Sequence, residues 1–229
     1  ECAKGIKTAW DKVSGDFADL ILILEGGNEE AISICKDNRI TLVSATGSTQ
    51  MGKELAPIVS ARLGKLLLEL GGNNAAIVCP SADLDLTIKG IAFSACGTTG
   101  QRCTSLRRLF VHKDIYEDCV QRLQDCFDDL VIGCPSKESS QIGPLISEHS
   151  YNMMQETLDS LKSKGIDVIG GERMNIEDPE EFYVKPALVL VDEVEEEMLK
   201  ETFAPILYVK KYKDLKDAIF MQNNVSQGL

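Results

Sequence analysis

The sequence lacks several features that would place it in a special class of protein. It has no apolar run near the roughly 20 residues that a membrane-spanning helix requires. Basic residues are not in excess, because 24 lysines and arginines stand against 36 acidic residues, a net charge of −12. No internal repeat, low-complexity tract or flexible linker is visible. With 44% hydrophobic and 26% charged residues, the chain reads as an ordinary globular protein that binds neither nucleic acid nor membrane.

The eight cysteines form no Cys-x-x-Cys pair. A chain of 229 residues buries enough apolar surface to fold without disulfides or a structural metal. Cys119, Cys126 and Cys134 do not have the spacing of zinc ligands, and Cys119 and Cys126 lie seven residues apart, on one face of an expected helix. We therefore expect reduced, mostly buried thiols and no metal site.

Short apolar runs alternate with helical patterns along the chain. This alternation predicts βαβ units, an α/β fold and a largely parallel sheet whose strands are buried on both faces. Strands are expected at residues 20–24, 40–45, 66–70, 75–79, 109–112, 168–169, 187–191 and 206–210. Helices are expected at residues 50–63, 84–96, 115–130, 148–164 and 215–222. Arg107-Arg108, beside a strand, predicts a surface or salt-bridging pair, and the acidic residues 192–201 predict a solvated surface.

The segment Thr46-Gly47-Ser48-Thr49 follows an expected strand and opens an expected helix. A glycine there allows a ligand to approach the backbone, and the helix N-terminus favours an anion such as a pyrophosphate. An ordinary Ser/Thr N-cap after a glycine turn is the alternative, since the spacing is not that of Gly-x-Gly-x-x-Gly.

Two further segments carry reactive side chains. Leu68-Glu69-Leu70-Gly71-Gly72 sets a carboxylate among leucines, where desolvation would strengthen it as a general base; an edge-strand glutamate that faces water is the alternative. Gly100-Gln101-Arg102-Cys103 places a cysteine in a glycine-containing loop, where Arg102 or a peptide dipole would favour a nucleophilic thiolate. From this segment alone, a thiol without a catalytic role remains the alternative.

Together these segments resemble the aldehyde dehydrogenase superfamily, in the same order and with the same separation of 34 positions between Glu69 and Cys103. Glu201-Thr202-Phe203-Ala204-Pro205 is similar to the family's Glu-x-Phe-x-Pro motif. Ile142-Gly143-Pro144-Leu145 also resembles a segment of the family. Three segments look most like the antiquitin branch, which acts on α-aminoadipic semialdehyde in lysine breakdown: Gly71-Gly72-Asn73-Asn74, Gly100-Gln101-Arg102-Cys103 and residues 201–209. Many other branches carry a lysine in place of Asn73.

The resemblance covers the middle of a family subunit and implies a divided chain. Residues 1–69 would be the last part of an incomplete Rossmann-like NAD-binding domain, and residues 70–229 most of an α/β catalytic domain without its C-terminal end. The start at Glu1 and the end at Leu229 likewise predict a piece of a longer protein or a trimmed form. The resemblance further implies a homotetramer, in the cytoplasm or the mitochondrial matrix.

The resemblance also implies a role for each candidate residue. Cys103 would be the nucleophile and Glu69 the general base that activates the hydrolytic water. The residues implied to bind NAD are Thr46, Gly47, Ser48, Leu70, Glu201 and Phe203. The residues implied to bind the small-molecule aldehyde are Arg102 and Thr104, although a structural hydrogen bond to the backbone is an equal alternative for Arg102.

Three other functions remain open at this stage. The chain could be a truncated, non-catalytic form that keeps the fold without binding the cofactor. It could be a thiol esterase that uses Cys103 and Glu69 without NAD. A relative of the acyl-phosphate reductases is a weaker fourth possibility, because those enzymes do not need Glu69 to activate water.

Overall fold

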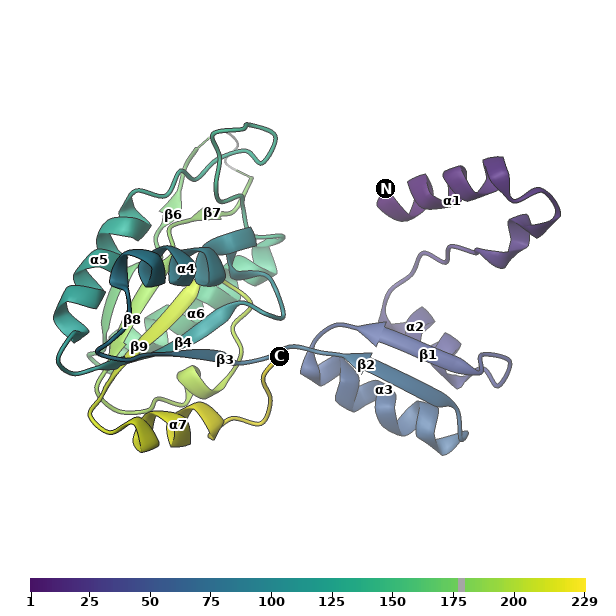
Figure 1. Cartoon of the computed structure of the whole chain (residues 1–229). Coiled ribbons are helices and arrows are strands. Elements are labelled where there is room, and N and C mark those ends of the chain that lie inside the picture. Colours follow the sequence, from purple (N-terminus) through teal and green to yellow (C-terminus); the bar gives the residue numbers. More distant parts are fainter. Residues whose placement is uncertain (177–179) are drawn as a thin grey trace. The chain divides into compact units, whose positions relative to one another are not determined.

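The structure is a computed structural model that describes residues 1–176 and 180–229. It contains two compact units, Glu1–Leu70 and Gly71–Leu229, called here the N-terminal and C-terminal units (Figure 1). Within the described residues, no helix combines the length and apolar character needed to cross a membrane. The same residues contain no group of three or more His, Cys, Asp or Glu side chains that could hold a metal ion.

The N-terminal unit is a small α/β element with a two-stranded parallel sheet. Its strands pair in register, with Val43 opposite Leu66 and Thr46 opposite Glu69. A small core of Cys35, Val43, Leu55 and Val59 lies between the sheet and two helices. The elements are α1 (Cys2–Val13), the 3-10 helix η1 (Gly15–Leu20), α2 (Asn28–Lys36), β1 (Leu42–Thr46), α3 (Thr49–Ala61) and β2 (Lys65–Glu69).

The strand predicted at residues 20–24 is wrong. Leu20 ends η1, the residues that follow it have no regular structure, and Leu20, Leu22 and Leu24 are exposed. A strand needs a neighbour to accept and donate its backbone hydrogen bonds, and among the described residues β1 pairs only with β2. Helices α1 and α2 were not predicted, and α1 buries no residue in this structure.

The C-terminal unit contains a five-stranded sheet in the order β3-β4-β9-β8-β5. The first four strands are mutually parallel and only β5 runs antiparallel, so the mainly parallel α/β fold is as predicted. Two short strands, β6 and β7, form a separate antiparallel pair. The elements are β3 (Asn74–Val78), α4 (Leu84–Cys96), the 3-10 helix η2 (Gly97–Gly100), β4 (Leu106–His112), α5 (Tyr116–Asp128), α6 (Glu148–Ser163), β5 (Asp167–Gly170), β6 (Arg173–Met174), β7 (Tyr183–Val184), β8 (Ala187–Val191), the 3-10 helix η3 (Glu197–Leu199), β9 (Ile206–Tyr212) and α7 (Leu215–Asn223).

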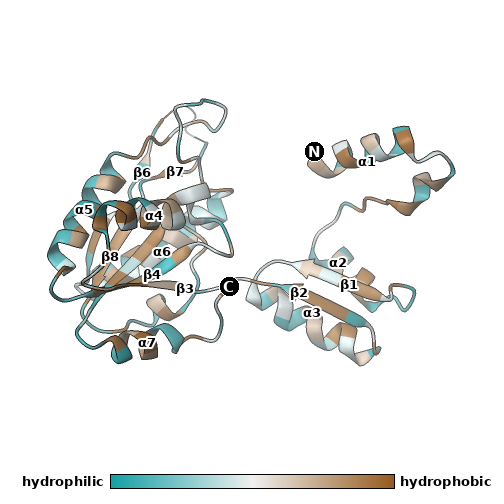
Figure 2. Ribbon diagram, viewed as in Figure 1, coloured by the Kyte–Doolittle hydropathy of each residue, from teal (hydrophilic) through white to brown (hydrophobic). Residues whose placement is uncertain are grey.

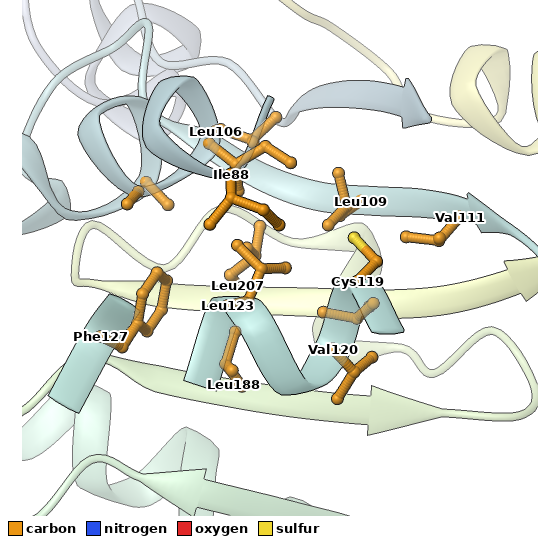
Figure 3. Packing of buried hydrophobic residues seen from close by; sticks show 14 of the residues in the cluster. Ile88, Leu106, Leu109, Val111, Cys119, Val120, Leu123, Phe127, Leu188 and Leu207 are labelled. Carbon is orange, nitrogen blue, oxygen red and sulfur yellow. The ribbon is translucent and has the colours of Figure 1, made fainter. Parts of the chain in front are cut away.

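This sheet is buried on both faces, as the continuous apolar strands predict. Leu109 and Val111 point to one face, where α4 and α5 cover them, and Phe110 points to the other face, against α6 (Figure 3). This alternation is the normal period of two along a strand. Figure 2 shows hydrophobic residues along the central strands and hydrophilic residues on the outer side of α5.

The parallel arrangement brings three distant segments of the sequence to one edge of the sheet. β3, β4 and β9 are neighbours that run in the same direction, with Asn74 opposite Leu106 and Arg108 opposite Tyr208. The segments that precede parallel strands therefore meet at the same edge. These segments are residues 71–73, 97–105 and 201–205, and they contain most of the predicted catalytic-domain motifs.

Candidate active site

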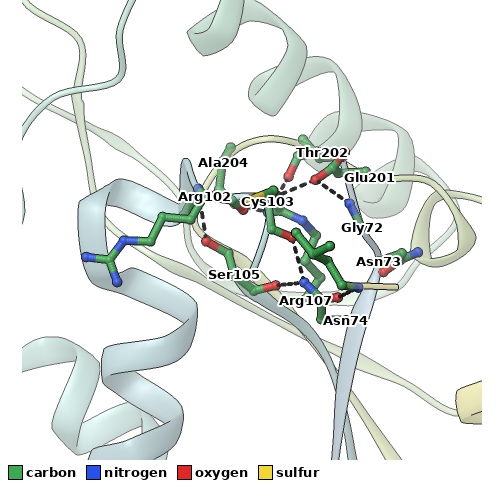
Figure 4. Close-up of polar contacts among 12 residues, drawn as sticks. Gly72, Asn73, Asn74, Arg102, Cys103, Ser105, Arg107, Glu201, Thr202 and Ala204 are labelled. Atoms are coloured by element: carbon green, nitrogen blue, oxygen red, sulfur yellow. Dashed lines mark hydrogen bonds and ion pairs between the residues drawn. The ribbon is translucent and has the colours of Figure 1, made fainter. Parts of the chain in front are cut away.

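Cys103 lies at the tip of a tight turn immediately before β4 (Figure 4). The N–H of Ser105 donates to the carbonyl of Arg102 at 3.1 Å, and the N–H of Arg102 donates to Oγ of Ser105 at 3.2 Å. The amide Nδ2 of Asn74 donates to the carbonyls of Cys103 (2.8 Å) and Ser105 (3.0 Å). Cys103 is partly buried and its neighbour Thr104 is exposed, so the fold presents the thiol on a firmly held turn.

The chain enters this turn through a left-handed backbone. Thr98, Thr99 and Gly100 have φ of 54°, 56° and 66°. A β-branched residue rarely adopts that conformation, because it strains the contact between Cβ and the backbone. At Gly100 a side chain is excluded for a second reason: a Cβ would lie 2.5 Å from the backbone carbonyl carbon of Ala204. We call residues 97–105 the nucleophile loop.

A segment from the familiar Ile142-Gly143-Pro144-Leu145 motif holds the nucleophile loop from the side. Oγ1 of Thr99 donates to the carbonyl of Gly143 at 2.9 Å. The amide of Gln101 donates to the carbonyl of Pro144 (3.3 Å) and accepts from the N–H of Ile146 (2.9 Å). These contacts explain why the motif accompanies the cysteine, since they hold a backbone conformation that is unfavourable by itself.

Arg107, on β4, joins the nucleophile loop to residues 201–205, which we call the carboxylate loop. Its guanidinium is 2% exposed and donates to carbonyls of both loops and to Oε1 of Glu201 at 3.1 Å. Burial lowers the pKa of Arg107, and the nearby Glu201 carboxylate opposes that change. The ring of Phe203 lies over the guanidinium, with 5.3 Å between the ring centroid and Cζ.

The glycine pair Gly71-Gly72 lies against Glu201. The N–H of Gly72 donates to Oε1 of Glu201 at 3.3 Å, and a Cβ on Gly71 would overlap Oε2 of the same carboxylate. Any larger residue at position 71 would therefore displace Glu201. Among the described residues, Oε2 of Glu201 accepts no hydrogen bond and remains available to a ligand.

The interpretation of Arg107-Arg108 as a surface pair is wrong. Arg107 forms the predicted salt bridge, but it is buried, and Arg108 is 1% exposed on the opposite face of the strand. Arg108 donates to the carbonyl and Oδ1 of Asn73 and to the carbonyls of Met221 and Gln222. Both guanidinium groups are tolerated inside the fold because backbone carbonyls and the side chains of Asn73 and Glu201 accept hydrogen bonds from them, while Nε of Arg107 is buried without a partner among the described residues.

Residues 192–201 are mostly exposed, as predicted for a solvated surface, but two of their carboxylates are largely buried. Glu193 has 92% of its side chain exposed, but Glu197 has 17% and Glu201 18%. Glu197 accepts from Nζ of Lys164 at 2.7 Å and from Oγ of Ser160 at 2.6 Å. These contacts lower the pKa of Glu197 to about 2.

Arg102 directs its side chain away from the thiol and toward α4 (Figure 4). Its Nε donates to Oγ1 of Thr98 at 2.7 Å, and its guanidinium lies 5.3 Å from the centroid of the Phe93 ring. The structural partner is thus a side-chain hydroxyl, not the backbone. Within the described chain the two terminal amino groups of Arg102 donate no hydrogen bond.

The remaining candidate residues lie in the N-terminal unit, at the ends of β1 and β2. Ser48 caps α3, because its Oγ accepts from the N–H of Met51 at 3.1 Å, and the N–H of Gly47 donates to the carbonyl of Glu69 at 3.0 Å. Thr46 ends β1 and is exposed. Leu70 packs so closely on α3 that a Cβ at Gly52 would lie 2.5 Å from its Cδ1.

The surroundings of Glu69 differ from a leucine-lined setting. Strand alternation turns Leu66, Leu68 and Leu70 toward the core, and it exposes Glu69 on the other face of β2. Within the N-terminal unit, the exposure of Glu69 matches the alternative interpretation, an edge-strand glutamate that faces water.

The structure therefore gathers the candidate residues in two groups. Cys103, Arg102, Thr104, Glu201 and Phe203 lie in the C-terminal unit, whereas Thr46, Gly47, Ser48, Glu69 and Leu70 lie in the N-terminal unit. Sequence reasoning missed Arg107 and Asn74 as site residues. Two consecutive arginines inside an otherwise apolar strand were the available signal, because such a strand in a parallel sheet is buried on both faces.

Comparisons with known proteins agree with this architecture. The model of the "Aldehyde dehydrogenase family" matches residues 15–229. The α-aminoadipic semialdehyde dehydrogenase of Rattus norvegicus is 41% identical over 206 residues, which are 89% of this chain and 38% of the rat protein. The aldehyde dehydrogenase family 7 member A1 of Malus domestica is 39% identical over 204 residues, 89% of this chain and 40% of the apple protein.

Solved structures show the same fold. Betaine aldehyde dehydrogenase from Staphylococcus aureus, in complex with NAD+, superposes with a TM-score of 0.85 and 26% identity, over 89% of this chain and 41% of the bacterial chain. HpcC from Thermus thermophilus also superposes with a TM-score of 0.85 and 26% identity, over 90% of this chain and 41% of the HpcC chain. This chain thus spans about two fifths of the length of the relatives it matches.

Proposed function

This chain belongs to the aldehyde dehydrogenase family, and from that premise we propose that the protein oxidises an aldehyde to the carboxylic acid with NAD as the electron acceptor. The observation that carries the proposal is the turn that presents Cys103 between the Asn74 amide and the carboxylate loop. A thiol that only filled the core would not need a strained loop, a glycine at position 100 and a buried arginine to hold it.

Cys103 performs the first step of the proposed reaction. Its thiolate sulfur forms a bond with the aldehyde carbon, and the carbonyl oxygen takes up the negative charge of the tetrahedral adduct. A preorganised N–H donor lowers the free energy of that oxyanion. The N–H of Cys103 donates no hydrogen bond within the described residues and is one such donor.

The residues present fit a dinucleotide in two respects. The 13-residue helix α3 directs its positive end, capped by Ser48, toward Gly47 and Thr46, a setting that favours a pyrophosphate. Oε2 of Glu201 has the free acceptor that a ribose hydroxyl needs, and Phe203 and Leu70 supply apolar surface. When bound, NAD would take the hydride that leaves the adduct, and Cys103 would then carry a thioester.

Glu69 completes the proposed cycle. Its carboxylate takes a proton from water, and the resulting hydroxide attacks the thioester carbon, which releases the acid and restores the Cys103 thiolate. The end of β2 leaves the carboxylate accessible to water. An acyl-phosphate reductase would not use this step, so the hydrolysis product distinguishes the two reactions.

Arg102 and Thr104 recognise the substrate in this proposal. Arg102, whose side chain lies toward α4 in this structure, would turn its free amino groups toward a substrate carboxylate, which their fork suits, and the exposed Thr104, next to Cys103 in the sequence, offers a hydroxyl. These features, and relatives named for α-aminoadipic semialdehyde, support a semialdehyde acid from lysine catabolism as substrate. Replacing Arg102 by Gln is expected to raise the KM for the semialdehyde acid about tenfold more than the KM for an uncharged aldehyde of the same length.

The proposal extends to the whole protein as a homotetramer in the cytoplasm or the mitochondrial matrix. Light scattering after size-exclusion chromatography tests the assembly, and a dimer or monomer at working concentration would contradict it.

The deciding experiment measures NADH formation by the natural full-length protein with α-aminoadipic semialdehyde. We expect NAD-dependent turnover that the Cys103→Ala variant loses, while the Glu69→Gln variant keeps a single burst of NADH and loses steady-state turnover. Hydrolysis of a nitrophenyl ester with no NADH formation from any aldehyde would identify a thiol esterase instead. Absence of NAD binding by the full-length protein would identify a non-catalytic member of the fold.

A further inference from the structure

We propose that Arg107 is a positioning residue that couples the nucleophile loop to the carboxylate loop. Its one guanidinium fixes the positions of both the cofactor-binding side chain, Glu201, and the nucleophile, Cys103. This inference deepens the proposed function and rests on it, since it takes Cys103 as the nucleophile and Glu201 as a cofactor ligand.

The hydrogen bonds of Arg107 connect the two loops in pairs. Nη1 donates to the carbonyl of Gly100, in the nucleophile loop, at 3.1 Å, and to the carbonyl of Thr202, in the carboxylate loop, at 2.8 Å. Nη2 donates to the carbonyl of Arg102 at 3.0 Å and to Oε1 of Glu201 at 3.1 Å. Nη1 also donates a longer bond, of 3.4 Å, to the carbonyl of Ala204 in the carboxylate loop. Each terminal nitrogen therefore bonds to both loops, and neither loop can shift without breaking bonds to the other.

Only a guanidinium meets this geometry. Its planar fork holds the two nitrogens in fixed relation, whereas a lysine ammonium is a single point on a flexible stem. The ring of Phe203 lies over the group and restricts its tilt. Because Arg107 is 2% exposed, water cannot replace the lost donors when it is changed, so the five acceptors would lose their donor.

Arg108 provides a matched control on the same strand. It is equally buried, and its partners are Asn73 and the carbonyls of Met221 and Gln222, which lie outside both loops. Changing Arg108 to Lys therefore imposes a similar loss of buried hydrogen bonds without loosening the link between the two loops.

The experiment compares Arg107→Lys with Arg108→Lys in the full-length protein. Two quantities are measured: the rate of Cys103 alkylation by iodoacetamide without cofactor, normalised to the other seven cysteines of residues 1–229, and the Kd for NAD. For Arg107→Lys we expect Cys103 alkylation to slow about tenfold and the Kd to rise about tenfold, because several charge-assisted hydrogen bonds are lost. For Arg108→Lys both quantities should stay within about twofold of wild type, whatever its unfolding temperature.

Equal effects of the two variants, or no effect of Arg107→Lys, would reduce Arg107 to a structural residue. If Arg107→Lys does not fold, the Glu201→Gln variant decides. The coupling requires that it slow Cys103 alkylation in the absence of NAD, whereas a carboxylate that serves only the cofactor would leave that rate unchanged. Failure of the proposed function is seen separately, as a wild-type protein that binds no NAD and whose Cys103 reacts no faster than the other thiols.

Discussion

Replacing Gly100 by Ala should destabilise the C-terminal unit, because two independent features of the structure exclude a side chain there. The left-handed φ of 66° disfavours alanine by about 1–2 kcal/mol. The new Cβ would also lie 2.5 Å from the backbone of Ala204, and the shift needed to relieve that contact costs about 1–3 kcal/mol. The expected loss is about 2–5 kcal/mol, or roughly 5–15 °C in Tm for a unit of this size.

The same substitution at Gly90 is the control. Gly90 lies within α4, and a Cβ there would meet nothing within 4 Å. Alanine should therefore stabilise the helix by about 0.5–1 kcal/mol. Thermal and urea unfolding of both variants measure the difference, and site-resolved alkylation measures whether Cys103 slows in the Gly100→Ala variant. An unfolding free energy for Gly100→Ala within about 0.5 kcal/mol of wild type would show that the loop is not held as described.

Three further changes test other parts of the account. Gln101→Leu should lower the unfolding free energy by about 1–2 kcal/mol and slow Cys103 alkylation, because the link to the 143–146 segment is lost; an unchanged alkylation rate would refute the link. Ser48→Ala should cost about 1 kcal/mol in stability as a lost N-cap and should also raise the Kd for NAD, whereas an ordinary cap would change stability alone. The pKa of Glu197 is about 2 in the fold against an ordinary 4.5, so its ion pair with Lys164 stabilises the protein above pH 4.5, and that contribution disappears as the pH falls toward 2. Urea unfolding across this range should therefore show a weaker pH dependence for Glu197→Gln than for wild type, and identical slopes would refute the role of the pair.

Much of the C-terminal unit could be predicted because local signals and tertiary structure agree there. The helix at residues 84–96 begins after an Asp83 cap and ends at Gly97, and its predicted bounds match those of α4. The predicted strand at 187–191 matches β8 for a similar reason, since its apolar run is buried by helices on both sides of the sheet.

The errors occur where distant segments decide the outcome. β4 begins at Leu106, not at residue 109, because Arg107 and Arg108 find carbonyl acceptors 35 to 114 positions away or in neighbouring loops. No local pattern encodes those partners. The sequence left two settings open for Glu69, because a run of leucines hides the alternation that exposes every second residue of a strand.

The residues of the candidate site were predicted only in part. Motif resemblance named Cys103, Glu201 and Gly100, and it grouped segments that the parallel sheet brings to one edge. It gave no role to Arg107 or Asn74, because most of their hydrogen bonds go to carbonyls of segments that only the folded chain brings close.

The central claim, that Cys103 forms a covalent acyl intermediate, is tested most directly by trapping that intermediate. The Glu69→Gln variant of the full-length protein is mixed with α-aminoadipic semialdehyde and NAD+, quenched in acid, and digested for mass spectrometry of all its cysteines. We predict the acyl mass on Cys103 alone, in proportion to the NADH formed, and no adduct when NAD+ is omitted. An acyl group on another cysteine, or NADH formed without any acyl-cysteine, would contradict the account.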